Sequence, residues 1–395
     1  MILIDLSHTS HTRARTGVQK VSRSLFLALS GSQDQEVCAV TWDPYSQAWR
    51  ALLPFESEAL SDETTGTHRG ARWPMSWKIR GQIARWTNRS APSIPPASRL
   101  IVPEIFSAEI AAKLPLLSRQ IRGPRVALFH DAIALKLPEL TPTKTVARFP
   151  SYLRELLAFD GIAAVSEDSR NAIVEWWRWL GVPHTPEVTT IPLAVDAPKA
   201  DPVLGRNTRF PVVLCVGTLE GRKNHLALLD ACETLWTQGH RFELRLIGMA
   251  HPETGKTALQ RVHALQNTGR PLRYDGPADE KTLSAAYHEC AFTVYPSRME
   301  GFGLPVLESL SYGKPCICSA QGALGEASRD GGCLALPSVD SASLASAIAW
   351  LLANPEQYLR LSFAARERTQ KSWATYACDL LAWMDSLKMR SLSTG

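Results

Sequence analysis

Short apolar runs alternate with amphipathic stretches along the whole chain, and most polar residues fall between them. In the first half, this pattern predicts a strand over residues 1–6 and a helix over 17–29 whose apolar side chains share one face. A second helix is expected over 168–180, with Ser166 placed to cap its first turn. Further short apolar runs predict strands at 37–41, 100–102, 126–129, 161–165 and 188–193.

The alternation pauses at residues 194–208, which are polar, contain proline and glycine and show no period. Such a stretch is typical of a linker between domains. Strand–helix alternation then restarts at residue 210. The second half is predicted to contain strands at 212–216, 242–247, 272–274, 292–295, 315–319 and 333–336. Because repeated βα units build parallel sheets, we predict an α/β protein with one parallel sheet in each half.

The length of the chain agrees with two domains. A chain of 395 residues exceeds one ordinary core and suits two units of roughly 150 to 200 residues. We expect a first domain over residues 1–195, a second over 209–372 and a C-terminal helix over 373–390. A hydrophobic content of 45% and a charged content of 21% are typical of a soluble globular protein. No apolar run reaches the ~18 residues of a spanning helix.

The expected location is the cytoplasm. The first strand contains an acid and lacks a basic leading region, so a signal peptide is not expected. The eight cysteines are scattered, and most lie in apolar runs, as buried free thiols do. Cys316 and Cys318 form the one close pair, without a partner set for zinc. This cysteine usage favours a reducing compartment.

Positive charge is concentrated in the segment 64–103, which contains no acid, although the net charge of the chain is only +5. Trp73, Trp77 and Trp86 lie among its basic residues, which are Arg69, Arg72, Lys78, Arg80, Arg85, Arg89 and Arg99. A basic amphipathic helix on an anionic membrane is one interpretation. A solvated insertion with its tryptophans packed on the domain is the second, and nucleic-acid binding is the third.

The run from Glu300 to Glu308 carries the clearest candidate chemistry. It follows a predicted buried strand, its glycines allow close backbone approach to a ligand, and Pro305 suits the first position of a helix. Free amides at a helix start bind anions, whereas carboxylates accept hydrogen bonds from sugar hydroxyls. Two carboxylates placed in this way can hold two diols, as a nucleotide sugar requires. The alternative is a tight turn with two surface glutamates.

A second strand–glycine turn supplies cations. Gly217 follows the strand at 212–216, and Arg222 and Lys223 are expected at the start of the next helix. There, a diphosphate can lie against both the helix dipole and the two side chains. The alternative is a solvated basic pair. The turn after a parallel strand is, however, where open α/β sheets bind their ligands.

Together these motifs resemble the retaining nucleotide-sugar glycosyltransferases of family 4, which have two facing Rossmann-like domains (the GT-B fold). Glu300 and Glu308 match the paired glutamates of that family, and Arg222 and Lys223 match its cations. Gly221 stands where the family usually has proline. Three further stretches match its first glycine loop, its active-site His-Asp pair and a later loop: 16–21, 129–131 and 322–326. The first of these most resembles bacterial mannosyltransferases of O-antigen and exopolysaccharide assembly.

The resemblance implies a role for each matched residue. Glu308 would hold the ribose, and Glu300 would hold the donor sugar, with His130 reaching that sugar from the first domain. Arg222 and Lys223 would neutralise the leaving diphosphate. Donor binding is also expected at Gly17, Gly217, Gly301, Phe302, Gly303 and Leu304. The acceptor side is expected to include Asp131, Arg13 and Arg15.

The predicted activity is transfer of a hexose, with retention of anomeric configuration, to a glycan or lipid-linked glycan in cell-surface polysaccharide synthesis. GDP-mannose is the favoured donor. The chain contains no Asp-x-Asp motif, so we expect neither a metal nor another cofactor. Peripheral contact with the membrane is expected through the basic segment, and no nucleic-acid partner. Two alternatives are a non-catalytic GT-B protein that binds sugar nucleotides or acts as a scaffold, and a nucleotide-sugar epimerase.

Overall fold

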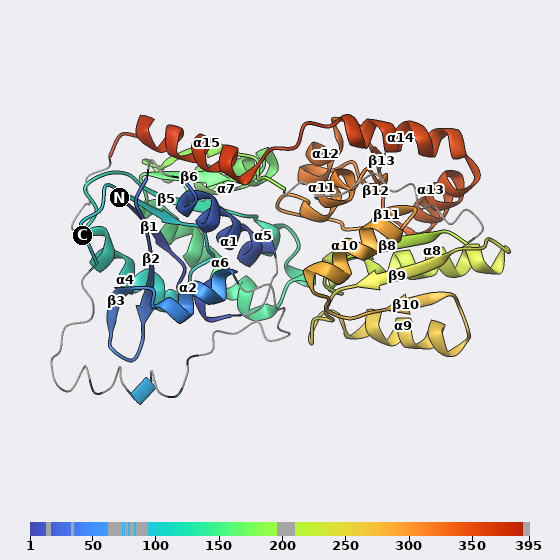
Figure 1. Ribbon diagram of the computed structural model, residues 1–395, viewed down its shortest axis with the longest axis horizontal. Coiled ribbons are helices and arrows are strands. Elements are labelled where there is room, and N and C mark those ends of the chain that lie inside the picture. Colours follow the sequence, from blue (N-terminus) through green and yellow to red (C-terminus); the bar gives the residue numbers. More distant parts are fainter. Residues whose placement is uncertain are drawn as a thin grey trace.

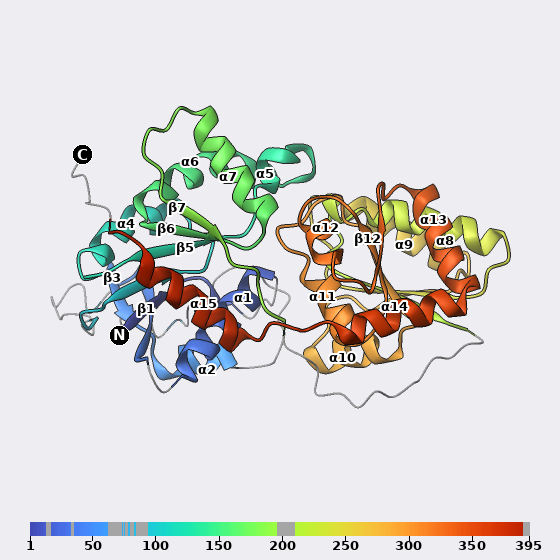
Figure 2. The ribbon, with the colours of Figure 1, turned by 90° about the horizontal axis from the view of Figure 1, so that it is seen from above.

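The computed structural model contains two α/β domains that lie side by side, each built on its own sheet (Figures 1 and 2). It describes residues 1–12, 17–32, 35–61, 73, 75, 78–79, 83, 94–195 and 210–389. Apolar strands, with helices on both faces, give each domain its own buried core. The predicted linker at 194–208 lies almost entirely outside the described residues.

The first sheet has seven strands in the order β3-β2-β1-β4-β5-β6-β7. They are β1 (Ile2–Asp5), β2 (Val37–Asp43), β3 (Ala48–Ala51), β4 (Arg99–Val102), β5 (Arg125–Phe129), β6 (Gly161–Ala164) and β7 (Glu187–Thr190). All neighbours are parallel except β2 and β3. The prediction of a purely parallel sheet is wrong at this edge. The four residues between β2 and β3 are too few for a crossover, so the chain turns back as a hairpin.

The second sheet has six strands, all parallel, in the order β10-β9-β8-β11-β12-β13. They are β8 (Val212–Val216), β9 (Glu243–Ile247), β10 (Leu272–Tyr274), β11 (Phe292–Tyr295), β12 (Cys316–Ser319) and β13 (Cys333–Leu336). The strand order reverses between β8 and β11. Ligands of open α/β sheets bind at such a reversal, beyond the carboxyl ends of the strands.

Helices cover both sheets (Figure 1). Those of the first domain are α1 (Gly17–Ser30), α2 (Pro54–Ser61), α4 (Ala108–Ser118), α5 (Ile133–Lys136), α6 (Thr143–Glu155) and α7 (Glu167–Trp179). Those of the second domain are α8 (His225–Thr237), α9 (Lys256–Asn267), α10 (Glu280–Glu289), α11 (Leu304–Ser311), α12 (Gly322–Ser328), α13 (Ser341–Ala353) and α14 (Pro355–Glu367). Ser166 caps α7 as predicted, because its hydroxyl accepts from the Ser169 amide at 3.1 Å.

The C-terminal helix α15 (Trp373–Ser386) leaves the second domain and packs on the first, where Figure 2 shows it beside α1. Tyr376, Leu380 and Met384 are fully buried in the same apolar cluster as Ile4 and Leu25. Burial of this apolar face ties the last helix to the first domain. The predicted return of the C-terminal helix to the first domain is confirmed.

Candidate active site

The turn after β11 packs closely against the first domain. A side-chain Cβ at Gly301 would lie 2.0 Å from the carbonyl oxygen of His130, so only glycine fits this position. The Ser166 hydroxyl donates to the Gly301 carbonyl at 2.6 Å. Since His130 follows β5 and Ser166 follows β6, these contacts bring the carboxyl ends of the two sheets together. The candidate site therefore lies between the domains.

Glu300 lies at the centre of a buried cluster of charges in this turn. Its Oε1 is 2.7 Å from Nη1 of Arg222 and 2.7 Å from Nζ of Lys223. The hydroxyl of Ser297 donates to the same oxygen, and Lys223 also contacts the hydroxyl of Tyr295. Burial would raise the pKa of Glu300, but the two cations outweigh it and lower that pKa to about 2. Glu300 is therefore ionised at neutral pH.

The loop that carries the cations differs from its prediction. We expected Arg222 and Lys223 at the start of a continuous helix. Instead, they lie in a 3-10 turn, η4 (Gly221–Lys223), and Asn224 adopts a left-handed conformation with φ 57° before α8 begins. The Asn224 amide donates to the carbonyl of Val339 at 2.7 Å, which holds this break in place. The break leaves the two cations outside α8 and directed at Glu300.

Glu308 lies in the second turn of α11, a helix that begins one residue before the predicted Pro305. Its Oε1 is 2.6 Å from Nζ of Lys20, and its Oε2 accepts from the hydroxyl of Tyr287 at 3.0 Å. Burial would raise the pKa of Glu308, but Lys20 outweighs it and lowers that pKa. Lys20 belongs to α1 of the first domain, so this ion pair joins the two domains.

Lys20 belongs to the stretch 16–21, which resembles the first glycine loop of the family, but the sequence analysis assigned it no role. A signal was present, because Lys20 lies on α1 less than one turn after Gly17. Nothing in its local sequence connects it to Glu308, however, because 288 residues separate the two. Only the facing of the two domains makes them neighbours.

His130 and Asp131 follow β5 on the opposite side of the same turn. His130 is 6% exposed, and its Nε2 lies 2.7 Å from the carbonyl of Pro103. A carbonyl accepts only, so Nε2 must carry the proton and Nδ1 is an acceptor. Burial lowers the pKa of His130, which is therefore neutral at neutral pH. Burial raises the pKa of Asp131 against the attraction of Arg222 across the domain boundary.

Two further acids at the carboxyl edge of the first sheet were not predicted. Asp5 ends β1, accepts from the Ser7 amide at 3.0 Å and is 1% exposed. Glu104 follows β4 and accepts from the amides of His8 and Thr9 at 2.9 and 2.7 Å. Burial raises the pKa of both, that of Asp5 to about 7. An acid at the end of an apolar strand was the available signal.

Glu326 makes a further contact between the two domains. Its carboxylate, on α12, accepts from the backbone amides of Glu167 and Asp168 at 2.9 and 2.8 Å. These amides form the first turn of α7 in the other domain, where unpaired donors and the positive end of the helix dipole favour an anion. The stretch 322–326, which matches a loop of the family, thus takes part in the contact between the two domains.

The remaining predicted residues are described by the structure, except for two arginines. Gly217, with φ 154°, begins the turn after β8, and a Cβ there would contact the side chains of Tyr295 and Lys223. Gly303 adopts a left-handed conformation, with φ 103°, immediately before α11. Gly17 begins α1, and Phe302 and Leu304 pack against the core of the first domain. Arg13 and Arg15 lie outside the described residues.

Most of the basic segment also lies outside the described residues, including Trp77 and Trp86. Trp73 is described, and its ring stacks on that of His11 with centroids 3.7 Å apart. This tryptophan packs on the first domain, as one of the three interpretations expected. Ile79 and Ile83, by contrast, are 53% and 56% exposed.

The described ranges contain neither a candidate metal site nor a candidate membrane-spanning helix. No group of three or more His, Cys, Asp or Glu side chains there is arranged to hold a metal ion. No helix in the same ranges combines the length and the apolar character needed to cross a bilayer.

Comparison with known proteins relates the chain to glycosyltransferases. Residues 196–368 match the family model for glycosyl transferases group 1. The second half of the chain is therefore similar to a group 1 glycosyltransferase domain, in agreement with the family resemblance of the sequence. Two solved structures share the architecture over 98% of this chain: sucrose-phosphate synthase from Thermosynechococcus elongatus, with a TM-score of 0.67 at 20% identity, and HepE of Anabaena in complex with UDP and glucose, with 0.66 at 14%. The aligned region covers 98% of the sucrose-phosphate synthase chain and 99% of the HepE chain. The predicted GT-B fold is confirmed.

Two curated relatives come from Escherichia coli. The chain is 26% identical to serotype-specific mannosyltransferase WbdA over 333 residues, and this aligned region covers 80% of the chain. It is 32% identical over 230 residues to O-antigen chain mannosyltransferase B, covering 55% of this chain and 59% of that protein. The chain spans only 38% of the length of WbdA.

Proposed function

We propose that this protein transfers a hexose, with retention of anomeric configuration, from a nucleoside-diphosphate sugar to a glycan or lipid-linked glycan acceptor. The favoured donor is GDP-mannose, and the favoured setting is cell-surface polysaccharide synthesis. The names of the two E. coli relatives support mannose. The fold, the group 1 domain and the charged turn at Glu300 support sugar transfer.

The observation that carries the proposal is the buried cluster of Glu300, Arg222 and Lys223 beneath the interdomain contact at Gly301. Departure of a nucleoside diphosphate requires positive charge held in place before the reaction, in a site closed to water. Glu220 and Glu300 hold the two cations in position, and the N–H groups of these cations are the donors that the leaving diphosphate requires.

The other residues follow from their places around this cluster. Glu308 holds the ribose hydroxyls through acceptor sites that Lys20 and Tyr287 do not occupy. Glu300 and the amides of residues 301–304 hold the donor sugar and the distal phosphate. His130, as a neutral imidazole, orients that sugar through its acceptor nitrogen. The acceptor hydroxyl attacks the anomeric carbon from the face that the diphosphate leaves, and the leaving phosphate accepts its proton.

One assay tests the proposal and separates it from its alternatives. The purified protein is incubated with a panel of nucleotide sugars and an α-mannoside acceptor, and the product is examined by NMR. We expect transfer from GDP-mannose and an α-linked product. A β-linked product would contradict retention. A protein that binds the donor but neither hydrolyses nor transfers it would be a scaffold, and one that returns an epimerised nucleotide sugar would be an epimerase.

Peripheral binding to the membrane is a separate part of the proposal, supported by the basic composition of 64–103 and the exposure of Ile79 and Ile83. A basic residue near an anionic surface contributes about 1 kcal/mol, so binding should weaken as salt rises. Co-sedimentation with anionic vesicles at low and high salt tests this. Equal binding by an Ile79→Ser, Ile83→Ser variant, or no binding by the wild type, would remove the membrane role and leave sugar transfer untouched.

A further inference from the structure

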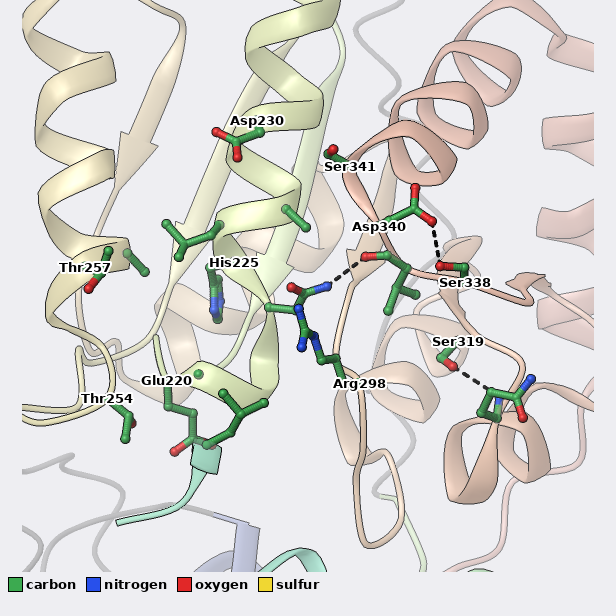
Figure 3. Close-up of a pocket in the computed structure, with 18 of the residues that line it drawn as sticks. Glu220, His225, Asp230, Thr254, Thr257, Arg298, Ser319, Ser338, Asp340 and Ser341 are labelled. Atoms are coloured by element: carbon green, nitrogen blue, oxygen red, sulfur yellow. Dashed lines mark hydrogen bonds between the residues drawn. The ribbon is translucent and has the colours of Figure 1, made fainter. Parts of the chain in front are cut away.

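A cavity opens beside the cation loop (Figure 3). Its volume is about 730 Å³, within the range of pockets that bind small organic ligands. Glu220 and Gly221 form part of its wall, and Leu140 reaches it from the first domain. None of the donor-site residues lines it, neither His130, Arg222, Lys223, Glu300 nor Glu308. The cavity thus adjoins the proposed reaction centre without being part of it.

The lining of this cavity is rich in groups that exchange hydrogen bonds. Its hydroxyls come from Thr254, Thr257, Ser319, Ser338 and Ser341. Its carboxylates come from Glu220, Asp230 and Asp340, and Arg298 supplies a guanidinium (Figure 3). Each carboxylate already has a protein partner, but an ionised carboxylate accepts several hydrogen bonds at once.

Unsatisfied polar groups also line this cavity, at the start of α8. Asn224 provides no side-chain cap there, so the first amides of the helix lack that partner. His225 is 2% exposed, and within the described residues its Nδ1 has no hydrogen-bond partner. The same is true of the hydroxyl of Thr254, another lining residue. A polar ligand in the cavity would supply partners to both atoms.

Charge decides which kind of ligand fits. Burial lowers the pKa of His225 to about 3, so this ring is neutral at neutral pH. Three carboxylates and one guanidinium line the cavity, and Arg222 and Arg261 pair with two of those carboxylates. The cavity therefore has no excess of positive charge, which disfavours phosphate or another anion. A neutral polyol, in contrast, donates its hydroxyl protons to carboxylates and accepts from Arg298 and the helix amides. Among neutral polyols, sugars match the proposed reaction.

We propose that this cavity is a glycan subsite, which holds neutral sugar residues of the acceptor chain beyond the residue that reacts. The inference rests on the proposed function for the identity of the chain but not for the binding itself. Placement between Leu140 of the first domain and α8 of the second puts the subsite along the domain boundary, where an acceptor must enter. Such a subsite would favour oligosaccharides over single sugars as acceptors.

Binding is tested directly by calorimetry with three neutral trisaccharides, mannotriose, maltotriose and cellotriose, in the presence of saturating GDP. We expect one of them to bind the wild type and to bind at least tenfold more weakly to Thr257→Trp, whose indole fills the cavity. Thr234→Trp is the matched control, because Thr234 is exposed on α8 outside the lining, and its affinity should be unchanged. Equal loss in both variants, or no binding of any trisaccharide, overturns the subsite.

Two further readouts keep the result independent of folding and of the donor. Arg298→Ala should weaken trisaccharide binding as well, with an unchanged circular dichroism spectrum. If the wild type also transfers mannose, Thr257→Trp should raise KM for a trisaccharide acceptor tenfold and leave donor hydrolysis unchanged. Trisaccharide binding without any transfer would refute the proposed function and retain the subsite. Binding of inorganic phosphate at the cavity in place of the sugars would overturn the neutral-glycan inference.

Discussion

The carboxylates on the two sides of the interdomain site are in opposite electrostatic states. In the second domain, Glu300 and Glu308 are held ionised by lysine and arginine side chains within 2.7 Å. In the first domain, burial raises the pKa of Asp5, Glu104 and Asp131.

This difference follows from how each side is built. The second domain places its acids beside two cations from the loop after β8 and one from α1 of the other domain, so Coulombic attraction exceeds the cost of burial. The first domain buries its acids against backbone amides and hydroxyls, where desolvation dominates. One side is therefore suited to charge that develops on a leaving diphosphate. The other is suited to hydrogen bonds with an uncharged sugar.

The largest expected effect removes the charge from the second-domain side. Arg222→Ala or Lys223→Ala should lower turnover about 100-fold to 1,000-fold, because one preorganised charge in a closed site contributes about 3 to 4 kcal/mol to the transition state. The fold should persist. Steady-state kinetics measures the effect, with Arg360→Ala on the exposed surface of α14 as control. Turnover within threefold of the wild type in both variants would show that the charged side does not act on the leaving group.

The next effect separates the two glutamates. Glu308→Ala should weaken binding of free nucleotide about tenfold to 100-fold, because hydrogen bonds to a charged group are lost. Glu300→Ala should leave nucleotide binding nearly unchanged and reduce transfer. Calorimetry with free nucleotide, paired with transfer assays, measures both. The reverse pattern would exchange the assignments of ribose and donor sugar.

A smaller effect tests the uncharged side through pH. The pKa of Asp5 is raised from its ordinary value of 3.8 to about 7. The unfolded chain therefore loses this proton first, and stability falls as pH rises from about 4 to 7. Asp5→Asn removes this dependence, so the stability of the variant relative to the wild type should rise by about 1.4 kcal/mol for each pH unit within that window. Urea unfolding at pH 4 and pH 8 measures the gain. A stability difference independent of pH would show that Asp5 is ionised in the folded protein.

The smallest expected effect is that of metal removal. Since Arg222 and Lys223 are proposed to supply the charge that a bridging cation supplies elsewhere, activity should remain within twofold after dialysis against EDTA. The same assay with added Mn²⁺ or Mg²⁺ serves as the reference. Complete loss on dialysis, restored by either ion, would transfer the charge-stabilising role from the arginine and lysine to a metal.

Part of this site could be read from local sequence. The strands lie close to the predicted apolar runs because a buried parallel strand needs continuous apolar residues. Glu300, Arg222 and Lys223 were found because the turns after β8 and β11 each combine glycine with charge. The left-handed Asn224 was missed, since its conformation depends on a hydrogen bond to Val339, 115 residues away.

The sequence by itself determined the two βα domains, the turns between their strands and helices, and the types of charged residue that those turns carry. Only the tertiary structure decided which charges meet. Lys20 reaches Glu308, and His130 closes on Gly301, because the domains face each other across their carboxyl edges. The same holds for charge states. A carboxylate beside lysine and one beside backbone amides have the same local sequence signal, but their pKa values depend on burial and on distant partners.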